Sequence, residues 1–206
     1  MTLVFDNQFN ENGCSVIGVD EAGRGALCGP VVVAAVRLFT PIEGLNDSKQ
    51  LSPKKRQALL PLILRNSCWA VISIPAEVVD TLNVLGATKL GMRLVASRVL
   101  RYSEMRCIVL LDGNQSLHFF EHEQTVVKGD SKSASIAAAS IIAKEHRDKI
   151  VTRLAIKYPE YGFADHKGYG TVAHYDALEK YGPSPVHRTS FRLTKKRKQE
   201  QLNFFG

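Results

Sequence analysis

The sequence predicts an α/β domain built on a mixed five-stranded sheet that is flanked by helices. Apolar runs of strand length and longer helical patterns follow one another as two strands, a helix, a strand, a helix, two strands and a helix. One of these runs, VVVAAV, is apolar throughout, which is typical of a strand covered on both faces. A chain of 206 residues is long enough to bury a sizeable core in one such domain.

Local signals place the individual elements. Ser52 has the character of a helix N-cap and Pro53 of a first helical residue, whereas Pro75 closes a strand and Pro159 ends a long helix. Shorter helical patterns follow that helix. The expected elements are strands 15–22 and 29–39, helix 53–65, strand 68–75, helix 83–103, strands 106–113 and 123–130, helix 131–158, an irregular segment 159–171 and helix 171–181.

Composition narrows the class of protein. The net charge is +7 and the pI is near 9.3, so the surface favours polyanions, with nucleic acid as the first candidate. No C-x-x-C pair occurs among the four cysteines, which predicts reduced core cysteines, a cytoplasmic protein and no zinc site. The N-terminus does not read as a secretory signal, and no uncharged apolar stretch approaches the roughly 20 residues of a membrane span.

Four acidic residues lie at strand ends or just beyond them: Asp20, Glu21, Asp112 and Asp130. Sites in open α/β sheets form outside strand ends, so the carboxylates of Asp20 and Asp112 meet if their strands are neighbours. Such a cluster repels itself without cations, and carboxylate oxygens are the ligands of hard divalent ions. Two ions about 3.5–4 Å apart can support phosphodiester cleavage. The cluster on a basic chain therefore predicts a metal-dependent nuclease.

The adjacency of Asp20 and Glu21 raises a geometrical problem. Side chains alternate along a strand, so the two carboxylates would point to opposite faces. We therefore expect the strand to end, twist or bulge here, as Gly23 and Gly25 permit, so that Glu21 reaches the cluster from the strand's tip.

At this point four blocks resemble the bacterial ribonuclease HII family in order and spacing: GVDEAGRG, LLDG, KGDSKSASIAAASIIAKEHRD and HKGYGT. The resemblance covers about residues 15–192. It implies a ribonuclease H-like fold with a C-terminal helical extension from about residue 160, preceded by an N-terminal segment 1–14 and followed by a basic tail 193–206. It also implies two Mg²⁺ or Mn²⁺ ions per active site.

The resemblance further implies an activity. The family cleaves RNA in RNA–DNA hybrids and nicks duplex DNA 5′ to an embedded ribonucleotide, which leaves 5′-phosphate and 3′-hydroxyl ends. Such an enzyme acts in ribonucleotide removal and RNA primer processing during DNA repair and replication. Nothing in the sequence demands more than a monomer.

Carried over by position, the resemblance assigns roles to individual residues. The four acids match the family's metal ligands, and the turn Gly23, Arg24 and Gly25 matches the one whose backbone reads the ribose 2′-hydroxyl, the group that separates RNA from DNA. Tyr169 matches a tyrosine that stacks on the next sugar. The positions that resemble contacts to the nucleic-acid backbone are Lys49, Lys132 and Ser133. We assign no role to His166.

The chain departs from the family pattern at two positions. Ala26 and Cys28 stand where proline and alanine are expected, which bears on the rigidity of the turn and not on the acids. The related ribonuclease HIII has an extra N-terminal domain and a lysine in the matching turn. Arg24 and the short segment before the first strand favour ribonuclease HII.

The tail contains QLNFF, which is similar to the short peptide that docks into bacterial sliding clamps. Gln201, Leu202, Phe204 and Phe205 are the candidate anchors, and packing of the tail on its own domain is the alternative. Two other functions remain open. A 3′–5′ exonuclease of the same fold typically carries Asp-x-Glu instead of adjacent Asp-Glu, and a non-catalytic nucleic-acid or clamp-binding protein has no need of all four acids.

Overall fold

A five-stranded mixed sheet forms the centre of the computed structural model, which describes residues 2–11, 13–45 and 50–194. The strand order is β3-β2-β1-β4-β5; β2 runs antiparallel to both β3 and β1, whereas β4 lies parallel to β1 and β5 parallel to β4. The mixed sheet is therefore as predicted. The strands are β1 (Ser15–Ala22), β2 (Val31–Leu38), β3 (Ser67–Ile74), β4 (Cys107–Asp112) and β5 (Glu123–Val126).

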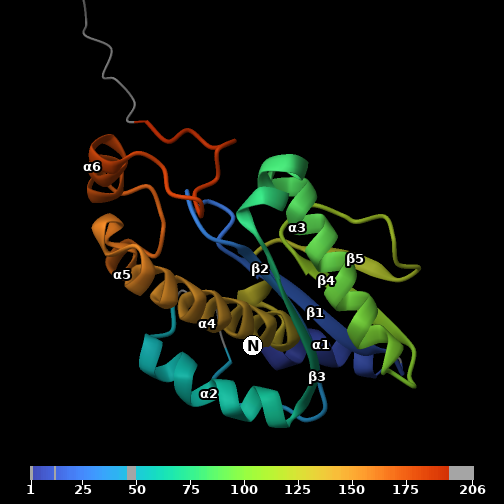
Figure 1. The fold of residues 1–206 in the computed structure, drawn as a ribbon. Helices are drawn as coiled ribbons and strands as arrows, with labels where there is room; N and C mark the ends of the chain where they lie inside the picture. The colour runs from blue at the N-terminus through green and yellow to red at the C-terminus, as the bar shows by residue number, and fades with distance from the viewer. Residues whose placement is uncertain (1, 12, 46–49, 195–206) are drawn as a thin grey trace, which may run out of the picture.

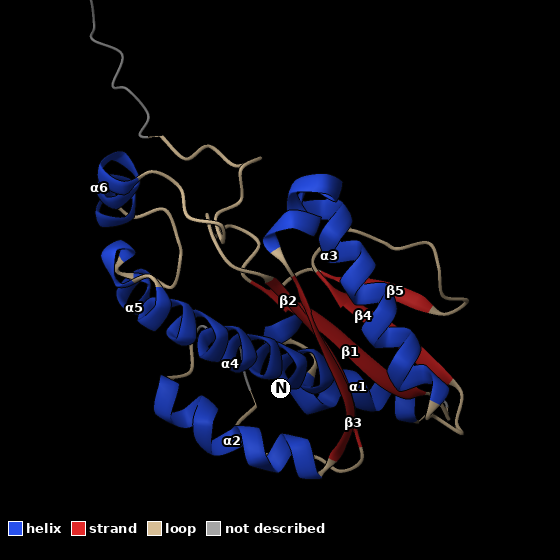
Figure 2. Ribbon diagram, viewed as in Figure 1, coloured by secondary structure: helices blue, strands red, loops and turns tan. Residues whose placement is uncertain are grey.

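Helices cover both faces of this sheet (Figures 1 and 2). Helix α3 packs on one face, and α4, with α2 beyond it, packs on the other. The short helices α5 and α6 follow α4 and form a separate hydrophobic cluster with its C-terminal part. The helices are α1 (Thr2–Asn10), α2 (Pro53–Arg65), α3 (Ala76–Arg101), α4 (Ala134–Lys157), α5 (Phe163–His166) and α6 (Val172–Tyr181), with 3₁₀ turns η1 (Gly129–Ser131) and η2 (Pro159–Tyr161).

The continuous apolar run of β2 is explained by this sandwich. Alternate residues of a strand point to opposite faces, and here both faces are covered. Val31 and Val33 belong to the core under α3, whereas Val32 and Ala34 belong to the core under α4. All four are fully buried.

Small residues allow α4 to lie very close to β1. The first turns of α4 consist largely of alanine and serine and are buried. A Cβ atom added to Gly18 of β1 would lie 2.2 Å from the backbone nitrogen of Ile136 and 2.2 Å from the carbonyl carbon of Ser135. The backbones of β1 and α4 are therefore in direct contact, which fixes α4 against the strand that carries Asp20.

Helix α3 begins earlier than the sequence pattern predicts. It starts at Ala76 and not at residue 83, because two helical segments join across a kink at Asn83 (φ 56°, ψ 167°). The Asn83 side chain accepts the backbone N–H groups of Leu85 and Gly86, both at 3.0 Å. Asn83 thus caps the second segment, and the sequence pattern detected only that segment.

The strand expected over residues 123–130 is shorter than predicted. β5 ends at Val126, and Lys128 adopts a left-handed conformation with φ 55°. The chain then enters η1, so Asp130 lies on a 3₁₀ turn and not at a strand end. The left-handed residue has no simple sequence signal, which explains the error.

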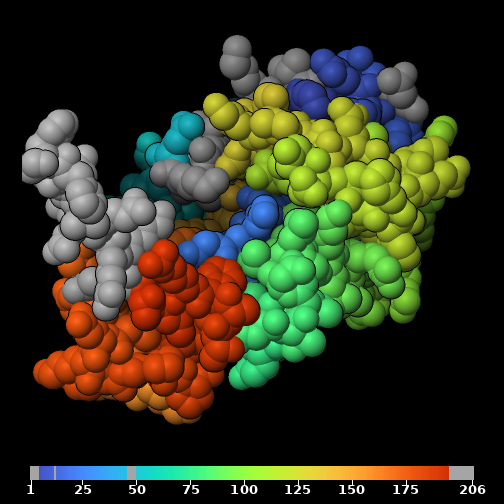
Figure 3. All heavy atoms as spheres, turned by 90° about the horizontal axis from the view of Figure 1, so that it is seen from above, coloured from blue at the N-terminus to red at the C-terminus, as the bar shows by residue number. Residues whose placement is uncertain are grey.

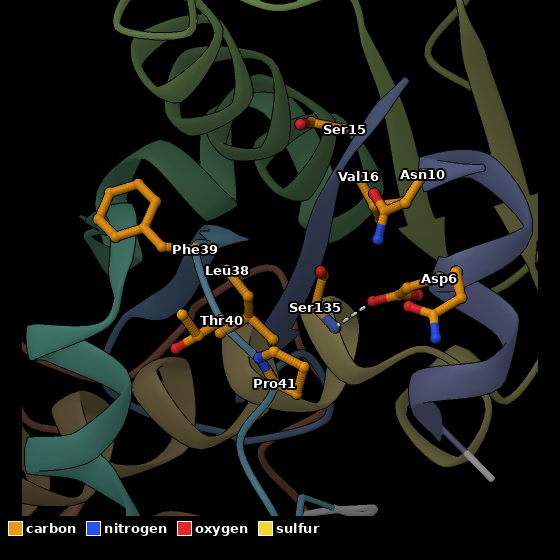
Figure 4. Close-up of a pocket in the computed structure, with 10 residues that line it drawn as sticks. Asp6, Asn10, Ser15, Val16, Leu38, Phe39, Thr40, Pro41 and Ser135 are labelled. Atoms are coloured by element: carbon orange, nitrogen blue, oxygen red, sulfur yellow. Dashed lines mark hydrogen bonds between the residues drawn. The ribbon is translucent and has the colours of Figure 1, made fainter. Parts of the chain in front are cut away.

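Helix α1 was not predicted from the sequence. Phe5 and Phe9 pack against a small cluster that includes Val16, and the carboxylate of Asp6 accepts the backbone N–H of Ser135 at 2.9 Å. Figure 4 shows Asp6 reaching from α1 to the start of α4, beside a pocket of about 70 Å³. None of the predicted site residues lines this pocket, and its residues fasten α1 to the domain.

Within the described residues, no helix is both long and apolar enough to cross a membrane. The four cysteines are free thiols; Cys28 and Cys107 are buried, whereas Cys14 and Cys68 are only partly buried, so the prediction that all four are core residues is wrong for these two.

Candidate active site

Asp20 and Asp112 lie side by side at one edge of the sheet. β1 and β4 are parallel neighbours, and Val19 of β1 is in register with Leu111 of β4. Asp20 and Asp112 are the next residues along the two strands, so the register brings both carboxylates to the same edge. The condition set by the sequence, that the two strands be neighbours, is met.

The environment of Asp20 opposes its negative charge. The side chain is buried, and the pKa of Asp20 is raised well above its usual value by burial and by the charges of Glu21 and Asp112. Hydrogen bonds from the Ser140 hydroxyl and from the Glu21 backbone N–H, 2.7 Å from Oδ1, act in the opposite direction. These like charges therefore form a cluster that a bound cation would stabilise.

Glu21 lies within a regular strand. β1 neither ends nor bulges at Asp20, because Glu21 pairs with Val33 and Ala22 with Val32 in unbroken antiparallel register with β2. The expectation of a strand end or bulge at this point is wrong. The Glu21 carboxylate lies 3.3 Å from the guanidinium of Arg24, which holds it at the start of the glycine turn.

Asp130 lies on η1, next to a residue that contacts Asp112. The backbone N–H of Gly129 donates to Oδ1 of Asp112 at 2.7 Å, so η1 is attached directly to the end of β4. Asp130 is itself buried. Lys132 is exposed at the end of η1, whereas Ser133 is buried and its hydroxyl caps α4 by accepting the N–H of Ile136. Ser133 thus has a structural task in α4.

The glycine turn and Tyr169 lie together. Gly23 is buried with φ +93°, whereas Arg24 and Gly25 are exposed. A β-bridge joins Ala26 to Tyr169, and the nearest atom to a Cβ built on Gly25 would be Cε1 of Tyr169, at 3.9 Å. Tyr169 is 40% exposed, so its ring is available beside the turn.

Figure 3 looks onto a hollow in this part of the surface. The blue segment that follows β1 lies in it, between the red C-terminal segment, the green start of α3 and the yellow-green segment around β5. The turn after β1 is therefore surrounded by three parts of the chain that are far apart in sequence. Lys49 and the tail residues Gln201, Leu202, Phe204 and Phe205 lie outside the described residues.

The two glycines of the turn should respond differently to alanine. We expect Gly23→Ala to reduce the free energy of unfolding by about 2–5 kcal/mol, because its Cβ would lie 2.0 Å from Nε of Arg147 at a positive φ. Gly25→Ala meets only an ordinary contact and should change stability by less than about 1 kcal/mol. Urea denaturation of both variants tests this, and equal stability of the two would contradict it.

Sequence reasoning missed two buried arginines beneath the turn. Arg147 donates to the carbonyl oxygens of Pro30 (3.2 Å), Lys167 (3.1 Å) and Cys28 (3.4 Å), and its guanidinium lies 5.3 Å from the ring centre of Tyr169. Buried arginines are uncommon, since an unpaired buried charge is strongly unfavourable. The helical spacing offered a signal: Arg147 lies four residues from the buried residues Ala143 and Val151 of the same helix.

Arg188 is the second of these arginines. It donates to Gly29 O from Nε (3.0 Å) and Nη2 (2.9 Å), and to Arg24 O from Nη1 (2.9 Å). Arg188 is fully buried. The two guanidiniums thus hold the segment from Arg24 to Pro30 through its backbone carbonyls.

Cys28, His174 and His187 could be mistaken for a metal site, since one ligand atom from each lies within 4.8 Å of the others. The backbone N–H of Ser184 donates to Nδ1 of His187 (2.9 Å), so the ring proton of His187 is assigned to Nε2. That Nε2 lies 3.0 Å from Nε2 of His174, whose Nδ1 is 2.9 Å from the carbonyl oxygen of Tyr169. With its proton on Nε2 and its Nδ1 occupied by the Ser184 N–H, the His187 ring has no nitrogen free to bind a metal. Burial also raises the pKa of the Cys28 thiol to about 12. The cluster is a hydrogen-bonded pair of neutral imidazoles.

This pair predicts a loss of stability in acid. Burial, followed by the neighbouring His174, lowers the pKa of His187 from its ordinary 6.5 to about 4. Between these values the unfolded chain binds more protons, so the free energy of unfolding should fall as the pH is lowered through this range. Urea denaturation at several pH values measures the slope. His187→Asn should flatten it and the surface change His122→Gln should not; equal slopes in all three proteins would contradict the prediction.

The sequence of this chain is similar to sequences of known proteins. The family profile described as Ribonuclease HII matches residues 17–194. The ribonuclease HII of Chlorobium luteolum is 47% identical over 187 residues, which cover 86% of this chain and 88% of that protein.

Solved structures share the fold. A chain of the PCNA–RNase HII complex from Archaeoglobus fulgidus matches with a TM-score of 0.72 and 24% identity, over 88% of this chain and 97% of that one. Bst-RNase HIII in complex with Mn²⁺ matches with a TM-score of 0.68 and 22% identity, over 94% of this chain and 71% of that one.

Proposed function

The chain belongs to the ribonuclease HII family and is a ribonuclease H, and from this we propose that it nicks duplex DNA 5′ to an embedded ribonucleotide as well as cutting RNA in RNA–DNA hybrids. The products are a 5′-phosphate and a 3′-hydroxyl. One observation carries the proposal: Asp20 and Asp112 lie side by side at the ends of neighbouring strands, and the turn that follows the strand of Asp20 has two exposed residues, Arg24 and Gly25. The metal ligands and the reader of the sugar are thus a few residues apart.

The donor set suits hard divalent cations. Asp20, Glu21, Asp112 and Asp130 offer only carboxylate oxygens, the ligands that Mg²⁺ and Mn²⁺ take up in proteins. The pKa of Asp20 is raised first by burial and then by the charges of Glu21 and Asp112, and a bound cation would offset both effects. We propose two Mg²⁺ or Mn²⁺ ions, which Asp20 and Asp112 would hold as the ligands closest to both and for which Glu21 and Asp130 would complete the sites; Mn²⁺ is bound in the related Bst-RNase HIII. When bound, such ions activate a water and stabilise the leaving oxygen.

The residues beside the acids select the nucleotide. The exposed backbone at Arg24 and Gly25 can approach a ribose closely, and a 2′-hydroxyl offers it both a donor and an acceptor. The half-exposed ring of Tyr169 offers an apolar surface to the next sugar. Lys132 is exposed near the acids and can contact a phosphate, and we propose the same role for Lys49.

The test is a cleavage assay on three duplexes of one sequence. The first contains a single internal ribonucleotide, the second is all DNA, and the third has the ribonucleotide and blocked ends. With Mg²⁺ we expect a nick 5′ to the ribose in the first and third duplexes and none in the second. Loss of cleavage on the end-blocked duplex would indicate an exonuclease, and no cleavage of any duplex would indicate a binding protein.

We also propose that QLNFF docks into a sliding clamp. Support comes from the motif itself and from the related protein of Archaeoglobus fulgidus, which forms a complex with PCNA. A peptide of residues 195–206 should bind a bacterial clamp in a fluorescence titration, and the same peptide with Phe204→Ala and Phe205→Ala should not. Equal binding of both peptides, or none at high micromolar concentration, would refute the assignment.

The proposed catalytic unit spans residues 15–192 and works as a monomer in the cytoplasm. The free thiols of all four cysteines suit a reducing compartment.

A further inference from the structure

The backbone of the glycine turn is held from inside the protein by Arg188. Nη1 of Arg188 lies 2.9 Å from the carbonyl oxygen of Arg24, and Nε and Nη2 both donate to the carbonyl of Gly29. Within the described part of the chain, none of the hydrogen bonds of this guanidinium goes to a carboxylate. Its donors therefore act on backbone carbonyls alone.

This contact decides where the next N–H group points. A trans peptide is planar, and its C=O and N–H point in opposite directions. Because the Arg24 carbonyl is directed inward to Arg188, the N–H of Gly25 is directed outward. Gly25 is exposed, and none of the hydrogen bonds of the described residues uses its N–H. A free backbone donor thus points outward beside Tyr169, whose Cε1 would lie 3.9 Å from a Cβ built on Gly25.

We propose that Arg188 is a positioning residue for ribonucleotide selection: it fixes the Arg24–Gly25 peptide so that the Gly25 N–H is presented to the ribose 2′-oxygen. This inference rests on the proposed function, because it assumes that the turn reads that hydroxyl.

The chemistry of arginine suits this task. Its planar fork can bind two carbonyls at once, which the single ammonium group of lysine does not reproduce. Burial and the nearby Arg147 lower the pKa of Arg188 to about 10, so the guanidinium is still charged at neutral pH. Hydrogen bonds from a charged donor are about twice as strong as neutral ones, so they restrain the peptide more firmly.

Arg188 is itself anchored on both sides. Its backbone N–H donates to Leu27 O at 2.8 Å, which joins it to the segment after the turn. On the other side, Asp80 of α3 accepts the backbone N–H and the hydroxyl of both Thr189 and Ser190. The segment around Arg188 is thus fastened to α3 and to the turn, and both attachments fix the guanidinium.

The experiment measures discrimination in binding. In an Asp20→Asn background, which should bind without cutting, the dissociation constants of the ribonucleotide duplex and of the all-DNA duplex are measured by fluorescence anisotropy. We expect the parent to prefer the ribonucleotide duplex. Arg188→Lys should weaken binding of that duplex three- to tenfold and leave the all-DNA constant unchanged, as the loss of one hydrogen bond predicts. A purely structural role would weaken both equally.

Two further variants complete the design. Arg56→Lys alters another buried guanidinium, which pairs with Glu145 at 2.8 Å, and should leave the preference intact. If thermal melting shows that Arg188→Lys does not fold, Asp80→Ala, which loosens the segment from the surface, should reduce the preference instead.

The outcomes separate the two proposals. A preserved preference in Arg188→Lys, or in Asp80→Ala where the first variant does not fold, overturns the inference, and so does a parent without any preference. If the wild-type chain nevertheless nicks the ribonucleotide duplex 5′ to the ribose, the proposed function stands. A wild-type chain that does not nick it overturns the proposed function.

Discussion

Asp20→Asn should abolish cleavage and at the same time raise the melting temperature of the metal-free protein. The carboxylate is buried beside Glu21 and Asp112, and its pKa is raised by burial and by their charges, so the ionised form destabilises the fold. Asparagine removes the charge and keeps the size. For a domain of this length, each 1 kcal/mol gained should raise the melting temperature by about 2–4 °C.

The pH dependence follows from the sign of the shift. Between the ordinary pKa of an aspartate and the raised value in the fold, the folded protein binds more protons than the unfolded chain. The stability of the metal-free wild type should therefore fall as the pH rises through this range, and Asp20→Asn should lack this component. Thermal melts over a pH series measure both effects.

Mg²⁺ and a surface variant provide the controls. The ion should raise the melting temperature of the wild type more than that of Asp20→Asn, since it relieves the repulsion among the acids. Asp148→Asn removes an acid that pairs with Lys144 at 2.6 Å on the surface, so it should retain cleavage and gain no stability. An Asp20→Asn protein that melts below the wild type, or that still cleaves, would contradict the assignment.

Gly18→Ala should unfold the domain or destabilise it by more than about 4 kcal/mol, an exceptional value for a single methyl group. Its Cβ would lie 2.2 Å from backbone atoms of both Ser135 and Ile136. Backbone atoms cannot rotate away as a side chain does, so α4 would have to move off the sheet. Urea denaturation, or loss of soluble expression, measures the effect.

Gly86→Ala is the matched control for this change. Gly86 lies within α3, where the nearest contact of an added Cβ would be the Cβ of Leu82 at 3.4 Å. Alanine in a helix is favoured over glycine by roughly 0.5–1 kcal/mol, so this variant should be neutral or more stable. Similar destabilisation by both substitutions would show that the close contact of β1 and α4 is not the cause.

The sequence predicted best those elements that are buried on both sides, because such burial leaves a continuous apolar run. The apolar run of β2 predicted a doubly covered strand, and the apolar stretches before Asp20 and Asp112 predicted that both acids follow buried segments of core strands. Their adjacency in space required one further fact, the parallel pairing of β1 with β4, which no local pattern contains.

The elements that were misjudged depend on single residues or on tertiary contacts. Asn83 caps the second part of α3 from a backbone conformation with positive φ, and Lys128 adopts a left-handed helical conformation two residues after the end of β5; neither residue signals this in the sequence. Helix α1 is short, and its contacts through Phe5 and Asp6 reach residues more than a hundred positions away in the chain.

The supporting residues of the site were hidden for a different reason. Helical spacing gave a signal for the burial of Arg147, but Arg188 lies outside any helix or strand, and no sequence pattern shows that either arginine binds carbonyls inside the protein. His174 and His187 form their hydrogen bond only when α6 and the segment after it fold together. These residues support the turn without needing to touch a substrate.

On the proposed assignment of the four acids, the docking of α4 against β1 is also a condition for cleavage. α4 supplies the Ser140 hydroxyl to Asp20, and it begins just after the turn that holds Asp130. Until this helix packs, the acids of β1, β4 and η1 are separate stretches of chain with no common geometry. On this assignment, packing of the hydrophobic core assembles the acids, so a chain in which α4 has not packed should not cleave nucleic acid.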